Sequence, residues 1–392
     1  MHQNVTKKME SALLGAVVAD SASMGLHWIY DTARLAEVGG DAPEFHVPDA
    51  TNYEGVVGVF AHGGRPVGSL SRYGATVELV ANQMKTDGGV FNAPANAARF
   101  LSAFGYGGSF VGYVDHPAAG ALDVIRKRDS EIEASFRGLT DRIPFHTIVA
   151  IGPFVQHIAS DSEVGDAESR LRSALEGFPD VSLDDEQMAL VIARIDSLHE
   201  RYWSPTGVPD LQLPVLAPVI PAALAAAARG LDDTAYLSAV RTAAHLTHTE
   251  DNALAVGDFV ASMIKLLLAG SALEPAIESS LPMLPAELEA RVTDALNRSW
   301  GSTVAAAEEL GMSCALAEGL PLSLVTLTRA ESYIDAVRTT ILCGGDSCGR
   351  GLLVGAIAGL MWGTDGSTGV PQEWVGKVAA ADSVRAAAAP LA

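Results

Sequence analysis

Apolar residues along most of this chain recur at the spacing of an α-helix. Within residues 185–199, Met188, Val191 and Ile195 fall on one side of a helix with 3.6 residues per turn. Residues 256–267 repeat the pattern with a broader apolar stripe, which is typical of an amphipathic helix packed on a core. The periodicity therefore predicts an all-α fold, a compact single-domain helical bundle.

Two of the predicted helices carry small residues that let a neighbour come close. Gly351, Gly355 and Gly359 recur every four residues, so one stripe of the C-terminal helix has almost no side chains. Near the N-terminus, a broad apolar helical face between residues 9 and 18 contains Gly15. We expect each of these helices to pack against another at short distance.

Two segments lack a helical period. Residues 32–75 are rich in Gly, Pro and polar groups, and residues 105–112 contain four glycines. Long irregular segments inside a folded protein are commonly functional, so we expect the first to lie near a site. No linker composition divides the chain, and we predict one domain over residues 1–392 with an alanine-rich tail from about residue 379.

Charge narrows the classes of partner. The chain has 47 acidic and 26 basic residues, a formal net charge of −21, which argues against nucleic acid or an anionic membrane and leaves a small-molecule ligand. No uninterrupted apolar run approaches the roughly 20 residues of a membrane helix.

Cysteines at 314, 343 and 348 form neither a disulfide framework nor a zinc motif, which indicates a reducing, cytoplasmic compartment. The oligomeric state stays open.

The most informative motif runs from Cys343 to Arg350 and reads CGGDSCGR. Its Asp346 leads directly into the glycine-striped helix, where an aspartate is either a helix cap or a ligand for a metal or sugar. Cys348 lies in the first helical turn, where the helix dipole is expected to lower the pKa of the thiol. The alternative is that Cys348 only fills space in the core.

A second polar group follows the first predicted helix. Asp20 stands at the helix end, and the run from His27 to Asp31 adds two aromatic residues, Trp28 and Tyr30. Such rings offer a flat face for a base or sugar together with a polar tip. A single histidine is more often structural than functional, but His27 beside these aromatics indicates a pocket wall.

Three stretches resemble a known family. They are residues 312–363, with ESYIDAVRTTILCGGDS before the glycine-rich helix, the opening ALLGAVVADSASMG, and the middle stretch LTHTEDNALAVGDFVASMIKLLLAG. Together they resemble the ADP-ribosylglycohydrolase family, which includes dinitrogenase-reductase-activating glycohydrolases and the J1 crystallins. The resemblance spans nearly the whole chain and implies the helical domain of that family.

The resemblance also implies two Mg²⁺ ions, held by an early Thr/Ser-Asp-Asp motif and a late Asp-x-Asp-Thr motif. Asp346 occupies the first late position, but Cys348 and Gly349 stand where the second Asp and the Thr belong. At the early position, residues 73–75 read Tyr-Gly-Ala and carry no carboxylate. Because Mg²⁺ prefers hard oxygen ligands, we expect no dinuclear centre and at most a single Mg²⁺ ion on Asp346.

By this resemblance, the end of the first helix and the glycine-aspartate turn face each other across one site. Its expected catalytic residues are Asp346, Asp20, His27 and Cys348. Its expected ligand-binding residues are Trp28, Tyr30, Asp31, Tyr73, Thr76, Ser347 and Arg350.

Three functions fit these observations. The first is a divergent ADP-ribosylglycohydrolase-like hydrolase that cleaves a glycosidic bond of an ADP-ribose-like or nucleoside-like ligand, with carboxylates stabilising an oxocarbenium-like state. The second is a metal-independent enzyme acting on another small molecule through Cys348 and His27. The third is a non-catalytic descendant that binds a ligand or serves a structural role, as the J1 crystallins do on this scaffold.

Overall fold

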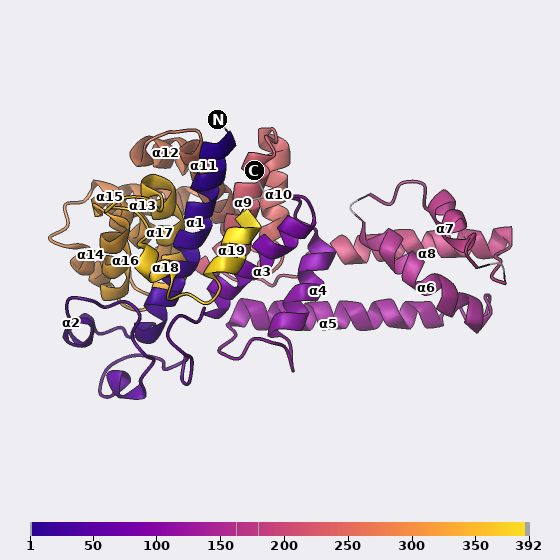
Figure 1. Cartoon of the computed structure of the whole chain (residues 1–392), viewed down its shortest axis with the longest axis horizontal. Coiled ribbons are helices and arrows are strands. Elements are labelled where there is room, and N and C mark those ends of the chain that lie inside the picture. Colours follow the sequence, from indigo (N-terminus) through magenta and orange to yellow (C-terminus); the bar gives the residue numbers. More distant parts are fainter. Residues whose placement is uncertain (1, 162, 179, 389–392) are drawn as a thin grey trace.

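The computed structural model describes residues 2–161, 163–178 and 180–388. The regular secondary structure of these residues is helical (Figure 1). The all-α prediction is confirmed: the described residues contain isolated β-bridges but no extended strand. The N-terminal helices are α1 (His2–Ser23), α2 (Thr32–Gly39), α3 (Arg72–Thr86) and α4 (Ala93–Phe104). Four more form an extension: α5 (His116–Arg137), α6 (Phe145–Ser160), α7 (Ala167–Leu175) and α8 (Asp185–Trp203).

The remaining helices complete the body of the molecule. They are α9 (Leu216–Ala228), α10 (Asp233–Ala244), α11 (Asp251–Leu268), α12 (Leu273–Ser280), α13 (Ala286–Asn297), α14 (Thr303–Leu310), α15 (Leu316–Arg329), α16 (Tyr333–Leu342), α17 (Ser347–Trp362), α18 (Gln372–Val375) and α19 (Ala381–Ala388). Short 3₁₀ turns η1 (Met24–Leu26), η2 (Ala50–Tyr53), η3 (Leu213–Val215) and η4 (Leu281–Met283) join some of them. None of the described helices is long and apolar enough to cross a bilayer.

The centre of the body is the pair α1 and α17. Residues 11–23 of α1 are all buried, as expected for a helix that is apolar on nearly every side. The glycines of both helices meet at the crossing, because a Cβ added to Gly355 would lie 2.6 Å from the Cβ of Ala19 and 2.8 Å from the carbonyl carbon of Gly15. The Tyr333 hydroxyl donates to the Gly15 carbonyl at 2.7 Å and fixes α16 onto the same pair. This contact places the end of α1 beside the start of α17.

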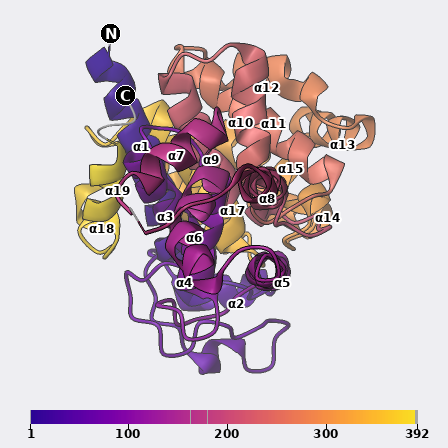
Figure 2. The ribbon, with the colours of Figure 1, turned by 90° about the vertical axis from the view of Figure 1, so that its right-hand side faces the viewer.

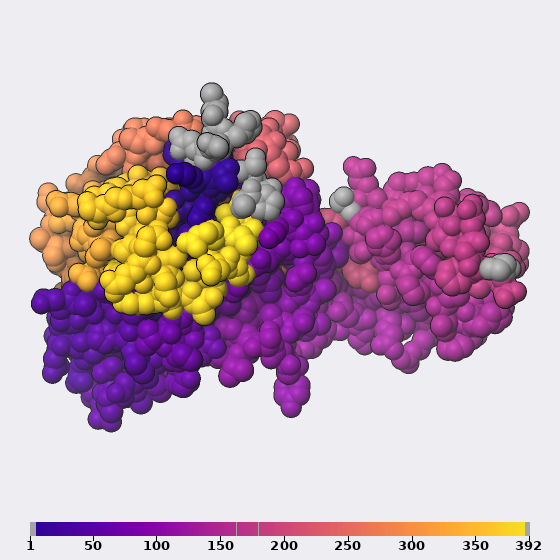
Figure 3. All heavy atoms as spheres, viewed as in Figure 1, coloured from indigo at the N-terminus to yellow at the C-terminus, as the bar shows by residue number. Residues whose placement is uncertain are grey.

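An extension of α5 to α8 projects from the body (Figures 1 and 3). Figure 2 looks along α5 and α8, which connect the two parts. The extension has an apolar cluster of its own, including Ile151, Val191 and Ile195, separate from the main core. At the start of α8, Asp184 and Gln187 form a capping box, so this acidic stretch is a helix start. The single-domain boundary over 1–392 stays a prediction.

An irregular segment between α2 and α3 wraps around the end of α1. Its backbone pairs with the stretch after α1 through Tyr30 N to Val57 O at 2.9 Å and Val59 N to Trp28 O at 3.0 Å. The segment is largely non-helical, as its composition predicts, and it carries apolar side chains on its outer surface, with Val57 75% exposed. It therefore covers the place where α1 and α17 meet.

Candidate active site

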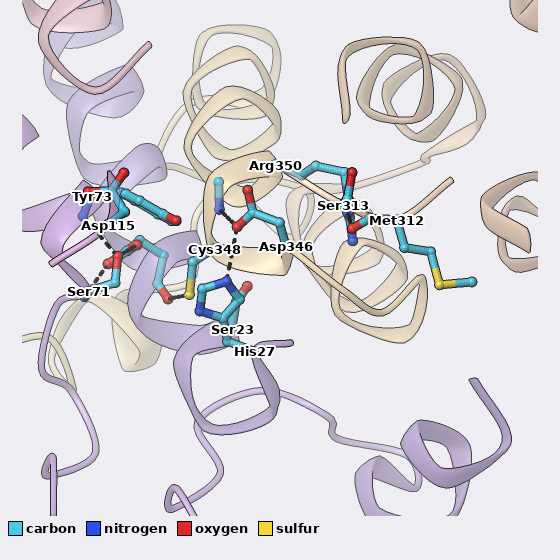
Figure 4. A network of polar contacts seen from close by, with 12 residues as sticks. Ser23, His27, Ser71, Tyr73, Asp115, Met312, Ser313, Asp346, Cys348 and Arg350 are labelled. Carbon is cyan, nitrogen blue, oxygen red and sulfur yellow. Dashed lines mark hydrogen bonds and ion pairs between the residues drawn. The ribbon is translucent and has the colours of Figure 1, made fainter. Parts of the chain in front are cut away.

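A buried ion pair joins the two ends predicted to meet. His27 follows η1, Asp346 is the N-cap of α17, and Nε2 of His27 lies 3.0 Å from Oδ1 of Asp346 (Figure 4). Both side chains are almost completely buried. The same oxygen accepts from the backbone N–H of Gly349 at 3.0 Å, so Asp346 caps the helix and binds His27 at once. The helix-cap alternative for Asp346 is thus observed, and its role as a ligand for a metal or sugar stays a prediction.

His27 is in turn bonded to a second histidine. Its Nδ1 lies 2.8 Å from Nε2 of His62, which comes from the covering segment. Burial, followed by the charge of His27 and that of Arg65, lowers the pKa of His62 to about 3, so His62 is neutral. Burial alone would raise the pKa of Asp346, but the hydrogen bond and charge of His27 outweigh it and hold that pKa below its usual value. The result is a chain from carboxylate to histidine to histidine.

The turn before α17 is held open by glycines and by one arginine. Gly344 and Gly345 have φ values of 72° and 59°, a region that favours glycine. The guanidinium of Arg350 donates to the carbonyls of Met312, at 2.9 Å, and Gly344. The terminal N–H groups of Arg350 thus position the Asp346 turn, whereas its Nε has no hydrogen-bond partner among the described residues. The expected contact of Arg350 with a ligand stays a prediction.

Asp20 caps α3 rather than lining a pocket. Its Oδ2 accepts from the backbone N–H of Ser71 at 2.8 Å, and its Oδ1 accepts from the Ser71 hydroxyl. Burial raises its pKa to about 7 against these hydrogen bonds. Both oxygens are used within the protein, so the common structural role fits Asp20 better than the catalytic one.

Cys348 differs from the sequence expectation. Its thiol is fully buried and donates weakly to the Asp20 carbonyl at 3.5 Å. Burial raises the pKa of this thiol well above its usual value, and the carboxylates of Asp20 and Asp346 act in the same direction. The expected lowering by the helix dipole is therefore wrong, because desolvation outweighs it.

Several buried oxygens near the ion pair have no hydrogen-bond partner among the described residues. They include Oδ2 of Asp346, the hydroxyls of Tyr73 and Ser347, and Oδ1 of Asp115. Figure 4 shows Tyr73 pointing toward Asp346, with Asp115 beside it. Burial raises the pKa of Tyr73 well above its usual value, so its hydroxyl stays a hydrogen-bond donor. Unpartnered buried polar groups are unusual in folded proteins, and here they supply acceptors and a donor for a hydroxyl-bearing ligand.

The other expected ligand-binding residues divide into two groups. Trp28 adopts a left-handed φ of 66°, donates to Gly345 O at 2.8 Å, and packs its ring 5.0 Å from that of Tyr113, so it belongs to the site wall. A non-glycine residue in this conformation often marks a functional site. Tyr30 is half-buried, and burial raises its pKa to about 12. Asp31 caps α2 through Arg34 N, which gives it a structural role.

Thr76 also has a structural role. Its hydroxyl donates to the Arg72 carbonyl at 3.0 Å within α3, as helical threonines often do. A cavity of about 880 Å³ lies elsewhere, against α3 and α4, and is bordered by Arg65, Lys85 and Arg99. The buried ion pair is closed off in this conformation because both side chains are almost completely buried, and the covering segment lies over it.

Comparison with known proteins agrees with this architecture. The family model described as ADP-ribosylglycohydrolase matches residues 1–392. The chain belongs to the ADP-ribosylglycohydrolase family. A solved structure entitled "ADP-ribosylglycohydrolase-related protein complex" has a similar fold, with a TM-score of 0.58 and 15% identity over 99% of this chain and 98% of that one. No curated protein sequence matches the chain.

The two-magnesium centre that the resemblance implies does not fit this ADP-ribosylglycohydrolase. At the early motif, a Cβ on Gly74 would lie 2.7 Å from the carboxyl carbon of Asp20. At the late motif, a Cβ on Gly349 would lie 2.8 Å from the carboxyl carbon of Asp346. The space of the expected ligands is thus taken by the two aspartates, and the thiol of Cys348 is a donor that Mg²⁺ disfavours.

Three residues of the site were not among the expected set. His62 sits in the irregular segment, where no spacing signals a partner for His27. Arg72 and Asp115 form a buried ion pair of 2.5 Å between α3 and the start of α5. Asp115 follows the glycine-rich loop noted in the sequence. Its position just before a helix was the one sequence feature that could have indicated a role in the site.

Proposed function

We propose that this family member is a glycosidase that cleaves a glycosidic bond in an ADP-ribose-like or nucleoside-like ligand without a two-magnesium centre. Family membership supports the reaction class. The observation that carries the proposal is the buried carboxylate oxygen Oδ2 of Asp346, which no protein group binds. A carboxylate in such a place is suited to stabilise the positive charge that develops at the anomeric carbon.

His27 and Tyr73 assist this carboxylate. A proton on Nε2 of His27 is donated to Oδ1 of Asp346, which fixes the orientation of the carboxylate and leaves Oδ2 free for the sugar. The Tyr73 hydroxyl donates to the ligand, and Oδ1 of Asp115 accepts from a ribose hydroxyl. In the reaction, the bond from the anomeric carbon to the leaving group breaks, a water oxygen bonds to that carbon, and one water proton ends on the leaving group.

Ligand entry requires the covering segment to move, because His27 and Asp346 are buried in this conformation. Gly55, Gly64 and Gly68 have positive φ values and divide the segment into short pieces. The side chains of Val57 and Val59 face solvent, so the segment is joined to the body there by backbone hydrogen bonds. Segments of this kind commonly open and close over active sites.

The test incubates the full chain with an ADP-ribosylated protein, with and without added Mg²⁺. The free ADP-ribose that is released is measured by chromatography. We expect turnover that Mg²⁺ does not increase. Asp346→Asn, which keeps the helix cap, should lower kcat by about 10²–10⁴-fold. The matched control is Asp185→Asn, an exposed carboxylate in the first turn of α8, which should leave the rate unchanged.

Two outcomes contradict the proposal. Full activity in Asp346→Asn would remove the carboxylate from the reaction. A wild-type chain that binds ADP-ribose, as shown by a raised melting temperature, but releases none from any ADP-ribosylated protein or nucleoside would support the non-catalytic alternative.

The location and ligand class belong to the same proposal. We place the protein in the cytoplasm because Cys314, Cys343 and Cys348 are all free thiols. We assign it a small-molecule ligand because its net charge of −21 disfavours nucleic acid and anionic membranes. Fractionation of cells expressing the tagged chain, with a known cytoplasmic enzyme as marker, tests the location.

A further inference from the structure

Three potential metal-ligand atoms converge in the interior beside the ion pair. Nδ1 of His27, Nε2 of His62 and Sγ of Cys348 all lie within 4.8 Å of one another, and all three residues are buried. They come from the end of α1, the covering segment and the first turn of α17. We propose that these three side chains bind one borderline-soft divalent transition-metal ion, with zinc the first candidate. The inference rests on this geometry alone and not on the proposed reaction.

The donor set selects the class of metal. Two imidazole nitrogens and one thiolate sulfur suit Zn²⁺ and its neighbours, whereas Mg²⁺ requires oxygen ligands. Catalytic zinc sites typically have three protein ligands and leave the fourth position for water or substrate. The cluster of His27, His62 and Cys348 supplies that number.

Asp346 binds the ring nitrogen of His27 that faces away from His62. It binds Nε2 of His27 at 3.0 Å, so the opposite nitrogen, Nδ1, is the one presented to His62 and Cys348. Metal-binding histidines commonly donate their second N–H to a carboxylate, which fixes the tautomer and the ring orientation. The hydrogen bond between His27 and Asp346 is therefore of the kind that supports a metal-bound imidazole.

Only small movements separate this arrangement from a tetrahedral site. The two imidazole nitrogens are 2.8 Å apart, and ligands of one zinc ion at about 2.0 Å would stand roughly 3.3 Å apart. The Cys348 thiol makes a weak hydrogen bond to the Asp20 carbonyl at 3.5 Å and a contact with the side chain of Ser71, and metal binding would replace both. Binding would replace the bond between the two rings and release the thiol proton.

The ion would also fasten the covering segment. His62 is the side chain of that segment that reaches the ring of His27, while the Tyr53 hydroxyl donates to the His27 carbonyl at 2.7 Å and the nearby Val57, Val59 and Phe60 are exposed. A metal bond at His62 would therefore attach the segment to both central helices. Metal loading should slow limited proteolysis within residues 54–70.

The experiment titrates the full chain with Co²⁺ as a spectroscopic probe and then adds Zn²⁺ in competition. We expect one Co²⁺ per chain, with thiolate-to-cobalt charge-transfer absorption in the near ultraviolet, and displacement by Zn²⁺. Cys348→Ser and His62→Ala should each abolish the charge-transfer band or weaken binding at least tenfold. Asp346→Asn should weaken binding about 10–100-fold while retaining the band at saturation.

Matched controls are Cys314→Ser, a free thiol outside the cluster, and His146→Ala, an exposed histidine of α6. Both should bind Co²⁺ as the wild type does, and circular dichroism confirms that each variant is folded. The proposal is wrong if the wild-type chain takes up no stoichiometric ion. It is equally wrong if Cys314→Ser loses the charge-transfer band in place of Cys348→Ser, or if His62→Ala binds with unchanged affinity.

Discussion

A single methyl group added at the crossing of α1 and α17 tests whether close helix contact determines this fold. In Gly355→Ala the new Cβ would lie 2.6 Å from the Cβ of Ala19 and 2.8 Å from the carbonyl carbon of Gly15, where about 3.4 Å is ordinary contact. Both neighbours are fixed parts of α1, so the helices must separate by close to an ångström. Alanine normally stabilises a helix by about 0.5–1 kcal/mol relative to glycine, whereas overpacking costs about 1–3 kcal/mol.

We take the upper end of the overpacking range because the clash involves the backbone of a buried helix. The net expectation is a loss of about 2 kcal/mol in the free energy of unfolding. For a chain of this length that corresponds to a melting temperature lower by about 2–3 °C. Equilibrium urea unfolding, followed by tryptophan fluorescence, measures the free energy directly.

Gly257→Ala is the matched control within the same body. Gly257 is buried in α11, and a Cβ there would make only ordinary contact with a methyl of Val219 at 3.4 Å. This variant should be as stable as the wild type or more stable by up to about 1 kcal/mol. A Gly355→Ala protein at least as stable as Gly257→Ala would refute the packing argument. The separation would also move His27 away from Asp346, so the glycosidase rate should fall with stability.

Three further predictions concern the charges of the site. Asp346→Asn leaves His27 without its carboxylate in the interior and should lower the free energy of unfolding by about 3 kcal/mol at pH 7, measured by urea unfolding; an unchanged value would contradict the ion pair. Burial, followed by the charge of Arg72, lowers the pKa of His248 to about 3. Below pH 6.5 the unfolded chain therefore takes up a proton at His248 that the folded chain does not, and the free energy of unfolding falls on acidification. Between pH 7 and pH 5 the wild type should lose about 2 kcal/mol more than His248→Asn, and equal losses would show that His248 does not stay neutral. Millimolar Mg²⁺ should leave the melting temperature of the wild type unchanged, and a rise that Asp346→Asn abolishes would restore a magnesium site at that carboxylate.

Helical periodicity and small-residue spacing predicted the fold well because they record local packing requirements. The stripe of Gly351, Gly355 and Gly359 identified a close helix contact before the partner helix was known. Local signals of this kind do not depend on the rest of the chain.

The site was predictable only in part. Resemblance brought His27 and Asp346 together, but burial decides what the other residues do, and burial depends on the whole fold. The high pKa of the Cys348 thiol and the inward use of Arg350 follow from their complete enclosure. His62 lies 35 residues from His27 in a segment without periodicity, so no sequence pattern joins them. The projecting extension was missed because its helices are amphipathic like those of the body.

The glycines at positions 74 and 349 bear on whether this lineage can return to magnesium chemistry. Asp20 and Asp346 have moved into the room that ordinary ligand side chains would need there. A reverting mutation to Asp at 74 or Thr at 349 would first have to displace a carboxylate that now caps a helix or pairs with His27. Each single reversion is thus disfavoured until several others accompany it. The side chains at positions 74 and 349 are thus coupled to the two aspartates, and neither position can accept a larger residue unless its neighbouring carboxylate shifts as well.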